Sequence, residues 1–244
     1  MKNQIGIIGH GRFGAYFATQ LRNAGYSVCA FDIAGGDGVL PLGELKKCPM
    51  VIYAVPIRAL RIAINETIAF LSPSAIVLDV CSVKMIPCGI LNELLPGFRR
   101  CGLHPLFGPQ SAPNSCVGQR MAVCWLESPY PEVQEMLGAL GVKVIECTPE
   151  EHDRQMAESQ FLTHFIGRAA EACGIQKVPL STKTHDDLMD IVEIITGNSV
   201  DLFHDMAVHN PMVAPARAKF LAAMIQVDAQ IAAKEAAVKD HCTS

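Results

Sequence analysis

The sequence lacks any concentration of positive charge. Its 244 residues carry 20 Lys and Arg against 24 Asp and Glu, and no basic cluster is longer than a pair. Nucleic-acid-binding proteins usually show a basic excess or patch, so we expect no nucleic-acid partner. Charged residues make up only 18% of the chain and hydrophobic residues 50%, which is ample for a core and argues against global disorder.

Long apolar runs are also missing. No stretch approaches the ~18 residues needed to cross a bilayer. The richest stretch, residues 51–64, is interrupted by Pro56, Arg58 and Arg61. Residues 1–4 lead directly into a short apolar strand and lack the longer apolar region of a signal peptide. We therefore expect no membrane partner and a cytoplasmic location.

The ten cysteines include no Cys-x-x-Cys pair, and none has zinc-finger spacing from a histidine. They indicate buried, reduced thiols in a cytosolic protein, and we predict no metal site.

Short apolar runs alternate with helical patterns as far as residue 148. Strands are predicted at residues 4–8, 28–31, 51–55, 75–80, 100–103, 121–125 and 142–145, and helices at 13–24, 60–71, 86–95 and 130–140. Continuous apolar strands separated by helices are typical of a parallel sheet covered on both faces. The predicted fold class is therefore α/β, with a doubly wound parallel sheet in a first domain of residues 1–148.

The rest of the chain contains no strand pattern. Thr148 can cap a helix, Pro149 suits its first turn, and Glu151 completes a capping box. Helices are predicted from residue 148 to about 173, at 184–195, at 201–209 and from 215 towards 239. Residues 149–244 are thus predicted to be a smaller all-helical substrate and dimerisation domain, because an apolar appendage of this size favours a homodimer.

A glycine-rich turn follows the first predicted strand and opens a helix. Its sequence, Gly9-His10-Gly11-Arg12-Phe13-Gly14, has the spacing G-x-G-x-x-G. Gly9 permits a tight turn, Gly11 lets the backbone approach a pyrophosphate, and Gly14 allows the helix to pack closely on the strand. This context predicts a Rossmann-type dinucleotide site formed by these six residues.

Asp32 stands at the end of the next strand, 18 residues after Gly14. Its carboxylate can bind ribose hydroxyls and would repel a 2′-phosphate, and residues 33–42 contain no Arg or Lys. The predicted cofactor is therefore NAD. Val55 and Pro56 end a central strand at the same edge of the sheet, where free carbonyls can line the nicotinamide side.

Two further segments follow strands and reach that edge, where ligands bind in such folds. One is residues 79–84, and the other is residues 101–109, which contain His104. A histidine there can take a proton or bind a hydroxyl near neutral pH, and Pro105 and Pro109 stiffen its loop. On spacing alone, a solvated loop histidine is an equally good interpretation.

A polar stripe lies on the long predicted helix that begins near residue 148. His152, Met156, Gln160 and His164 are spaced by four residues and therefore share one face. That face either looks back at the cleft beside the sheet or packs against another helix.

Taken together, these segments resemble one family, the prephenate and arogenate dehydrogenases of tyrosine biosynthesis. The resemblance covers about residues 4–170, and its H-P-x-F-G-P and H-D-R segments are much more specific than the glycine turn. The C-terminal third matches only loosely. The matching segments are Gly9–Gly14, Asp32, residues 54–56, residues 81–84, residues 104–109 and residues 152–164.

The resemblance implies oxidative decarboxylation of prephenate to 4-hydroxyphenylpyruvate, with hydride transfer to NAD. It implies that His104 holds the ring hydroxyl and removes its proton. Ser82 would hydrogen-bond the same hydroxyl or the cofactor, and Gln160 and His164 would face the substrate. Lys84 would support the site electrostatically.

Some relatives bind a substrate carboxylate with an arginine in the C-terminal helices. Here the corresponding region, residues 194–197, reads Ile-Ile-Thr-Gly. Arg217 is the nearest candidate and could come from a partner subunit, while Arg154 and Arg168 are alternatives.

Asn114 follows the H-P-x-F-G-P segment, in a loop linked to substrate choice in relatives of the plant type. A neutral side chain there favours the keto group of prephenate, whereas an acidic one would favour the ammonium of arogenate. The segment Ser-Gln-Phe-Leu-Thr-His at residues 159–164, however, resembles arogenate-type enzymes. An arogenate dehydrogenase that gives tyrosine directly therefore stays an alternative.

Two other classes of protein remain open. A β-hydroxyacid or pyrroline-carboxylate reductase would carry a lysine before an asparagine on the first helix of the second domain, where this chain has Gln160 and His164. A non-catalytic NAD-sensing module would need the glycine turn, but not His104 or Ser82.

Overall fold

A computed structural model of the protein describes residues 2–33, 35 and 38–242. Its first part is one seven-stranded sheet with the strand order β2-β1-β3-β4-β5-β6-β7. The predicted strands are confirmed to within a few residues. They are β1 (Lys2–Ile8), β2 (Tyr26–Phe31), β3 (Met50–Tyr53), β4 (Ile76–Asp79), β5 (Arg99–Pro105), β6 (Arg120–Trp125) and β7 (Lys143–Glu146).

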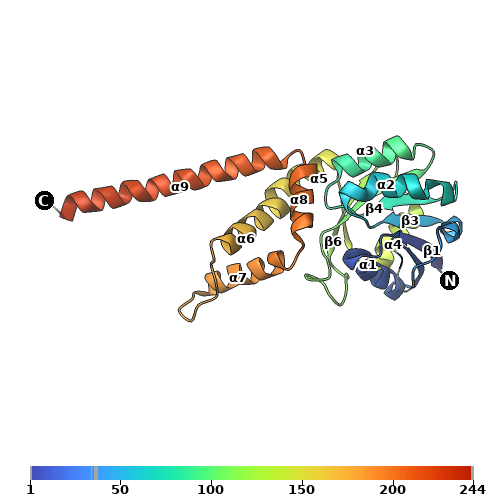
Figure 1. Ribbon diagram of the computed structural model, residues 1–244, viewed down its shortest axis with the longest axis horizontal. Coiled ribbons are helices and arrows are strands. Elements are labelled where there is room, and N and C mark those ends of the chain that lie inside the picture. The colour runs from blue at the N-terminus through green and yellow to red at the C-terminus, as the bar shows by residue number, and fades with distance from the viewer. Residues whose placement is uncertain (1, 34, 36–37, 243–244) are drawn as a thin grey trace.

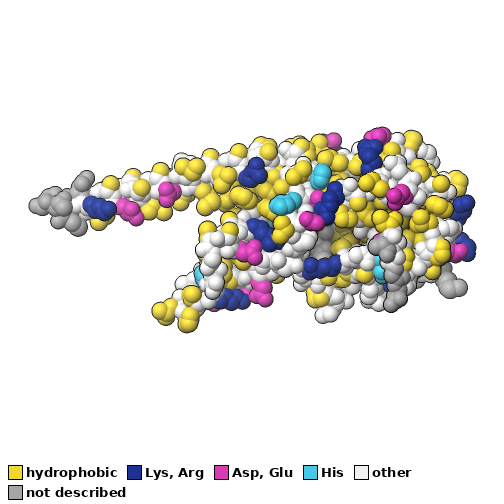
Figure 2. Space-filling model, viewed as in Figure 1, with side chains coloured by type: hydrophobic (Ala, Val, Ile, Leu, Met, Phe, Trp, Pro, Cys, Tyr) yellow, Lys and Arg dark blue, Asp and Glu magenta, His cyan; other side chains and the backbone are white. Residues whose placement is uncertain are grey.

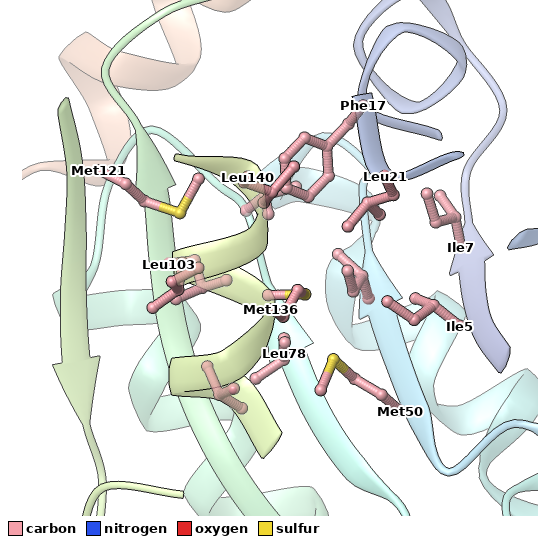
Figure 3. Close-up of a cluster of buried hydrophobic side chains, with 14 of the residues drawn as sticks. Ile5, Ile7, Phe17, Leu21, Met50, Leu78, Leu103, Met121, Met136 and Leu140 are labelled. Atoms are coloured by element: carbon pink, nitrogen blue, oxygen red, sulfur yellow. The ribbon is translucent and has the colours of Figure 1, made fainter. Parts of the chain in front are cut away.

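The sheet lies between two pairs of helices, α1 (Arg12–Asn23) with α4 (Pro131–Leu140), and α2 (Ile57–Thr67) with α3 (Met85–Leu94). Figure 1 shows the pairs on opposite faces. Successive side chains of a strand point to opposite faces. Ile52 of β3 therefore packs with α1 and α4, whereas Val51 packs with α2 and α3. Figure 3 shows Phe17 of α1 and Leu140 of α4 in the first of these two cores.

The direction of one strand differs from the prediction. Strands β1 to β5 are parallel, but β6 runs antiparallel to β5, and β7 is parallel to β6. Residues 106–119, which join β5 to β6, contain no helix. A parallel neighbour needs a long crossover, usually through a helix, so the chain reverses direction here instead. The doubly wound α/β fold is otherwise as predicted.

Every described element after β7 is a helix. The predicted first helix is formed by α5 (Pro149–Met156), a π-helical turn η3 (Ala157–Phe161) and α6 (Leu162–Ala172). The side chain of Thr148 accepts a hydrogen bond from the backbone N–H of Glu151 at 3.1 Å, so the predicted N-cap is confirmed. The other helices are α7 (Lys183–Thr196), α8 (Val200–His209) and α9 (Val213–Cys242).

Helix α9 extends away from the rest of the molecule (Figure 1), and only its first turns reach the small core around Phe161, Met206 and Val213. None of the described helices is long and apolar enough to cross a membrane.

Candidate active site

A cleft of about 550 Å³ lies between the carboxyl edge of the sheet and the helices of the second part. Figure 2 shows it as a hollow between the two parts, with basic and acidic side chains at its edge. The ends of β3, β4 and β5 meet at this edge because these strands are parallel. The lining includes nine of the residues predicted from the sequence, namely Gly11, Arg12, Phe13, Val55, Pro56, Ser82, His104, Gln160 and His164.

The glycine turn is shaped by close backbone contacts. Gly9 has a φ of +97°, and a Cβ atom on it would lie 2.6 Å from the carbonyl oxygen of Ala54. A Cβ on Gly14 would collide with the carbonyl oxygen of Gly9. Gly11 differs, because a Cβ there would meet no described atom within 4 Å. Because Gly11 directly precedes α1, this open space lies at the N-terminus of that helix, which has no side-chain cap.

Asp32 lies beside this turn, directly after β2. One of its carboxylate oxygens accepts a hydrogen bond of 2.7 Å from the backbone N–H of His10. The buried Nδ1 atom of His10 has no hydrogen-bond partner among the described residues. Asp32 therefore fixes the first glycine turn and places a carboxylate where the sequence analysis expected one. Of the loop that follows, residues 34, 36 and 37 lie outside the described residues.

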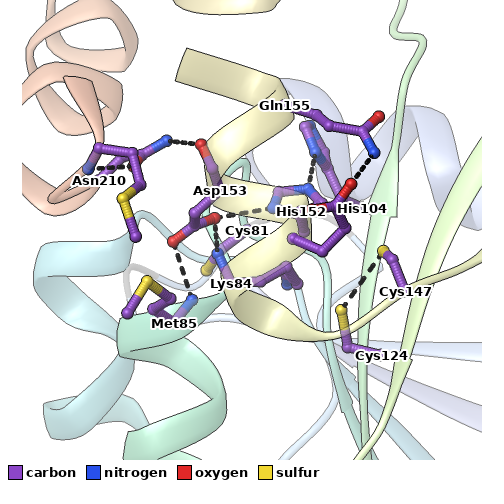
Figure 4. Close-up of polar contacts among 12 residues, drawn as sticks. Cys81, Lys84, Met85, His104, Cys124, Cys147, His152, Asp153, Gln155 and Asn210 are labelled. Carbon is purple, nitrogen blue, oxygen red and sulfur yellow. Dashed lines mark hydrogen bonds and ion pairs between the residues drawn. The ribbon is translucent and has the colours of Figure 1, made fainter. Parts of the chain in front are cut away.

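His104 lies near the end of β5 and is only 2% exposed. Its Nδ1 atom is 2.8 Å from Nε2 of His152 on α5. In turn, Nδ1 of His152 is 2.7 Å from a carboxylate oxygen of Asp153 (Figure 4). The sequence analysis placed His152 on the polar stripe but assigned no role in the site to it or to Asp153. The specific His-Asp-Arg segment was the signal that could have found them.

A buried ion pair between Lys84 and Asp79 lies behind His104. Burial lowers the pKa of His104 well below its ordinary value, and His152 and Lys84 act in the same direction. Burial also lowers the pKa of His152, although Asp153 opposes this shift. Burial disfavours the charge of Lys84, but Asp79 more than compensates, so the pKa of Lys84 is raised. At neutral pH, His104 is therefore a neutral imidazole near a buried cation.

Gln160 of η3 and His164 of α6 line the opposite wall of the cleft, so the polar stripe does face the sheet. Burial, with a smaller contribution from Arg168, lowers the pKa of His164. The buried Nδ1 atom of His164 has no hydrogen-bond partner among the described residues. A neutral histidine with an unsatisfied ring nitrogen is suited to binding a polar group of a ligand.

Two predicted substrate-binding residues are not brought to the cleft. Asn114 and Arg217 are both exposed, and neither is part of the lining. Asn114 lies in the irregular loop between β5 and β6, and Arg217 lies on the first turns of α9. The alternatives Arg154 and Arg168 are not lining residues either, and they pair with Glu151 and Glu171 on their own helices.

The arginines that do line the cleft are Arg12, which the sequence analysis assigned to the cofactor, and Arg58, which it missed. Arg58 of α2 bridges to α8 through hydrogen-bonded ion pairs of 2.6 Å with Asp201 and 2.8 Å with Asp205. Arg12 reaches the backbone carbonyl of Gly197 at 3.1 Å. Both contacts join the sheet-containing part to the helical part across the mouth of the cleft.

Two protein-family models match the chain. The model described as prephenate dehydrogenase, nucleotide-binding domain, matches residues 22–144, about half of the sequence. The chain belongs to the prephenate dehydrogenase family. A second model, described as TYRAAT1-like, C-terminal domain, matches residues 169–242. The match to the prephenate dehydrogenase model confirms the family resemblance identified from the motifs.

Known members of the family extend this similarity. Arogenate dehydrogenase 1, chloroplastic, of Arabidopsis thaliana is 29% identical over 229 residues, which cover 85% of this chain and 36% of the plant protein. The chain spans only about a third to two thirds of the first curated relatives that it matches.

Two solved structures share the fold of this chain. Synechocystis arogenate dehydrogenase superposes with a TM-score of 0.71 at 23% identity, over 95% of this chain and 93% of that one. Prephenate dehydrogenase from A. aeolicus, in complex with hydroxyphenyl propionate and NAD+, gives 0.73 at 18% identity, over 96% and 92%. At such identities the likeness concerns the fold alone.

Proposed function

We propose that the protein is an NAD-dependent dehydrogenase that oxidatively decarboxylates prephenate or arogenate in tyrosine biosynthesis. The observation that carries this proposal is His104, a buried and neutral imidazole at the edge of the cleft, with one ring nitrogen hydrogen-bonded behind it. Such a group is suited to removing a proton from a substrate hydroxyl.

The glycine turn fits the pyrophosphate of NAD. The open space at Gly11 and the uncapped N-terminus of α1 together form a cradle for an anion. Asp32, held beside the turn by the N–H of His10, would bind ribose hydroxyls and repel a 2′-phosphate. Val55 and Pro56 would line the nicotinamide side. When bound, NAD supplies the hydride acceptor.

The reaction needs one base and a positioned ring. His104 would take the proton of the ring hydroxyl on Nε2, and Ser82 would hold the same hydroxyl by a hydrogen bond. Gln160 and His164 would bind polar groups of the ring from the opposite wall. As the hydroxyl carbon loses its hydride to the bound cofactor, the bond to the ring carboxylate would break and carbon dioxide would leave. The electron pair of the broken bond would complete the aromatic ring, and the former hydroxyl oxygen would take back the proton from His104 to give the phenol.

Prephenate and arogenate differ in one side chain, a keto acid in the first and an amino acid in the second. The preference for prephenate rested on Asn114, which lies outside the cleft. Two carboxylates, Asp201 and Asp205, line it instead, and the single positive charge of Arg58, which pairs with both, leaves this group of three with a net negative charge. An ammonium group gains from nearby carboxylates and a keto group does not. This arrangement favours arogenate as the substrate.

A two-by-two assay tests the proposal. The purified protein is given prephenate or arogenate, each with NAD or NADP, and the absorbance of the reduced nicotinamide is followed. We expect turnover with NAD and arogenate, and slower turnover with prephenate. His104→Asn should bind NAD normally but lose turnover. No turnover in any arm, with NAD still bound, would instead favour the NAD-sensing module.

We further propose that the protein is a homodimer through α9. This helix projects from the molecule (Figure 1) and exposes a series of apolar side chains, which monomeric proteins rarely leave uncovered. They are Leu221, Met224, Ile225, Val227, Ile231 and Val238. Because Arg217 is exposed and outside the cleft of its own chain, any contact of Arg217 with substrate requires a second copy.

Sedimentation of the full chain tests this association. The expected mass is twice the 26.3 kDa of one chain. Ile225→Glu with Ile231→Glu should give a monomer, and Gln226→Glu, on an exposed polar position of the same helix, should not. A monomeric unmodified protein would contradict the proposal.

A further inference from the structure

A chain of hydrogen bonds links the two parts of the molecule behind His104. It runs from His104 on β5 to His152 and Asp153 on α5 (Figure 4). All three side chains are at most 3% exposed. Water therefore does not compete for these contacts, and each ring nitrogen in the chain has to match its partner as donor or acceptor.

Asp153 determines which atom donates in the hydrogen bond between Asp153 and His152. Its two carboxylate oxygens accept hydrogen bonds from the backbone N–H groups of Lys84, at 2.7 Å, and Met85, at 2.9 Å. These groups stand at the beginning of α3, where a negative charge is stabilised by the helix. A carboxylate held in this way is an acceptor only. The 2.7 Å contact with His152 must therefore be donated by Nδ1–H of His152.

The proton on Nδ1 of His152 also determines which ring donates in the contact between His152 and His104. A neutral imidazole carries one N–H, so Nε2 of His152 is left as an acceptor. The 2.8 Å contact between the rings then requires that His104 donates from its Nδ1. By the same rule, Nε2 of His104 has a free lone pair, and it is the nitrogen of the ring that remains for the cleft.

We infer that His152 and Asp153 are positioning residues that hold His104 in the tautomer with a proton on Nδ1 and a basic Nε2. This inference rests on the proposed function only where it speaks of turnover. Without an acceptor behind it, His104 could equally carry its proton on Nε2, and that tautomer cannot accept the proton of a hydroxyl.

The charged groups around the two histidines support neutral rings. Lys84 and Asp79 approach from the loop and strand before α3, and Asp153 approaches from α5. Burial is the largest influence and lowers the pKa of both His104 and His152. When His104 accepts a proton, its Nδ1–H still donates to His152, so no ring has to turn during the reaction.

Histidine tautomers can be read directly by NMR in protein labelled with 15N histidine, using couplings between ring nitrogens and ring protons. The His104 signals are assigned by their loss in His104→Asn. We expect the unmodified protein to show His104 protonated on Nδ1 at pH 7.5, and His152 likewise. A proton on Nε2 of His104 would overturn the inference. This result does not depend on turnover, so it separates the inference from the proposed function.

The kinetics of two His152 variants test whether turnover depends on the acceptor behind His104. His152→Leu removes the acceptor, and kcat should fall at least about a hundredfold, with the KM for NAD unchanged. His152→Gln keeps an amide oxygen that can accept from Nδ1 of His104, and it should recover at least about tenfold of that loss. His204→Leu makes the same chemical change at an exposed position and should behave as the unmodified protein.

A purely structural role for His152 predicts a different pattern. The Leu and Gln variants would then lose kcat in parallel with their loss of thermal stability, and the His104 tautomer would stay unchanged in His152→Leu. Either observation would overturn the inference. Should His152→Leu fail to fold, the NMR result on the unmodified protein and the Gln variant still decide.

Discussion

Gly11 offers a way to separate folding from cofactor binding. It precedes α1 with a φ of −68°, a conformation that any residue adopts, and a Cβ atom there would have no described neighbour within 4 Å. Gly11→Ala therefore adds a methyl group to open space in the free protein. In our proposal, the same space is where the pyrophosphate of NAD approaches the backbone.

The two effects differ in size. Alanine is a poorer N-cap residue than glycine, and the loss of folding stability should be at most about 1 kcal/mol. In a chain of this length, that lowers Tm by about 2–4 °C. A methyl group forced against a closely packed partner costs roughly 1–3 kcal/mol. The Kd for NAD should therefore rise by about five- to 150-fold.

Calorimetric titration with NAD and a thermal melt measure the two effects on the same sample. Gly97→Ala is the matched control, because Gly97 is exposed, has equally open space around its Cβ position, and lies outside the cleft. Unchanged NAD affinity in Gly11→Ala would refute the placement of the pyrophosphate. A fall in Tm far beyond about 4 °C would refute the claim that the space is open in the free protein.

Three further predictions concern charged and titratable groups of the site: two substitutions and one change of pH. Asp32→Asn keeps the contact with the N–H of His10 and should narrow the preference for NAD over NADP by about tenfold in kcat/KM. Lys84→Met leaves Asp79 buried without its partner and should cost about 3–5 kcal/mol in urea unfolding, most of which the double variant with Asp79→Asn should recover. The pKa values of His104 and His152 are lowered in the folded protein. Both rings therefore contribute folding stability at pH values above 6.5, their ordinary pKa, and this contribution is lost as the pH falls below 6.5. The unfolding free energy should drop there by up to about 1.4 kcal/mol per pH unit for each ring, and a flat profile would contradict this.

Local patterns predicted nearly every element of this fold, because apolar periodicity and capping residues act over a few positions. The strand β6 shows their limit. An apolar run such as residues 121–125 looks the same in either direction, and the direction follows from the connection before it. Residues 106–119 lack a helical pattern and contain Pro109 and Pro113, which could have predicted the reversal.

The sequence predicted those residues of the site that lie at or just after the ends of strands. His104 and Ser82 reach the cleft because parallel strands share a carboxyl edge. The contact between His104 and His152 joins residues 48 apart in sequence, and no rule based on sequence spacing predicts such a contact. Asn114 was placed by its distance from a motif, but the irregular loop carries it away from the cleft.

The π-helical turn η3 explains how one helix can serve both walls of the site. In an unbroken α-helix each residue turns by about 100°, so His152 and His164, 12 positions apart, would point about 120° away from each other. A π turn accommodates one extra residue. It reduces the effective separation to 11 positions, or about 20°. The same face can then hold His152 against His104 and present His164 to the cleft, which spacing by fours alone does not achieve.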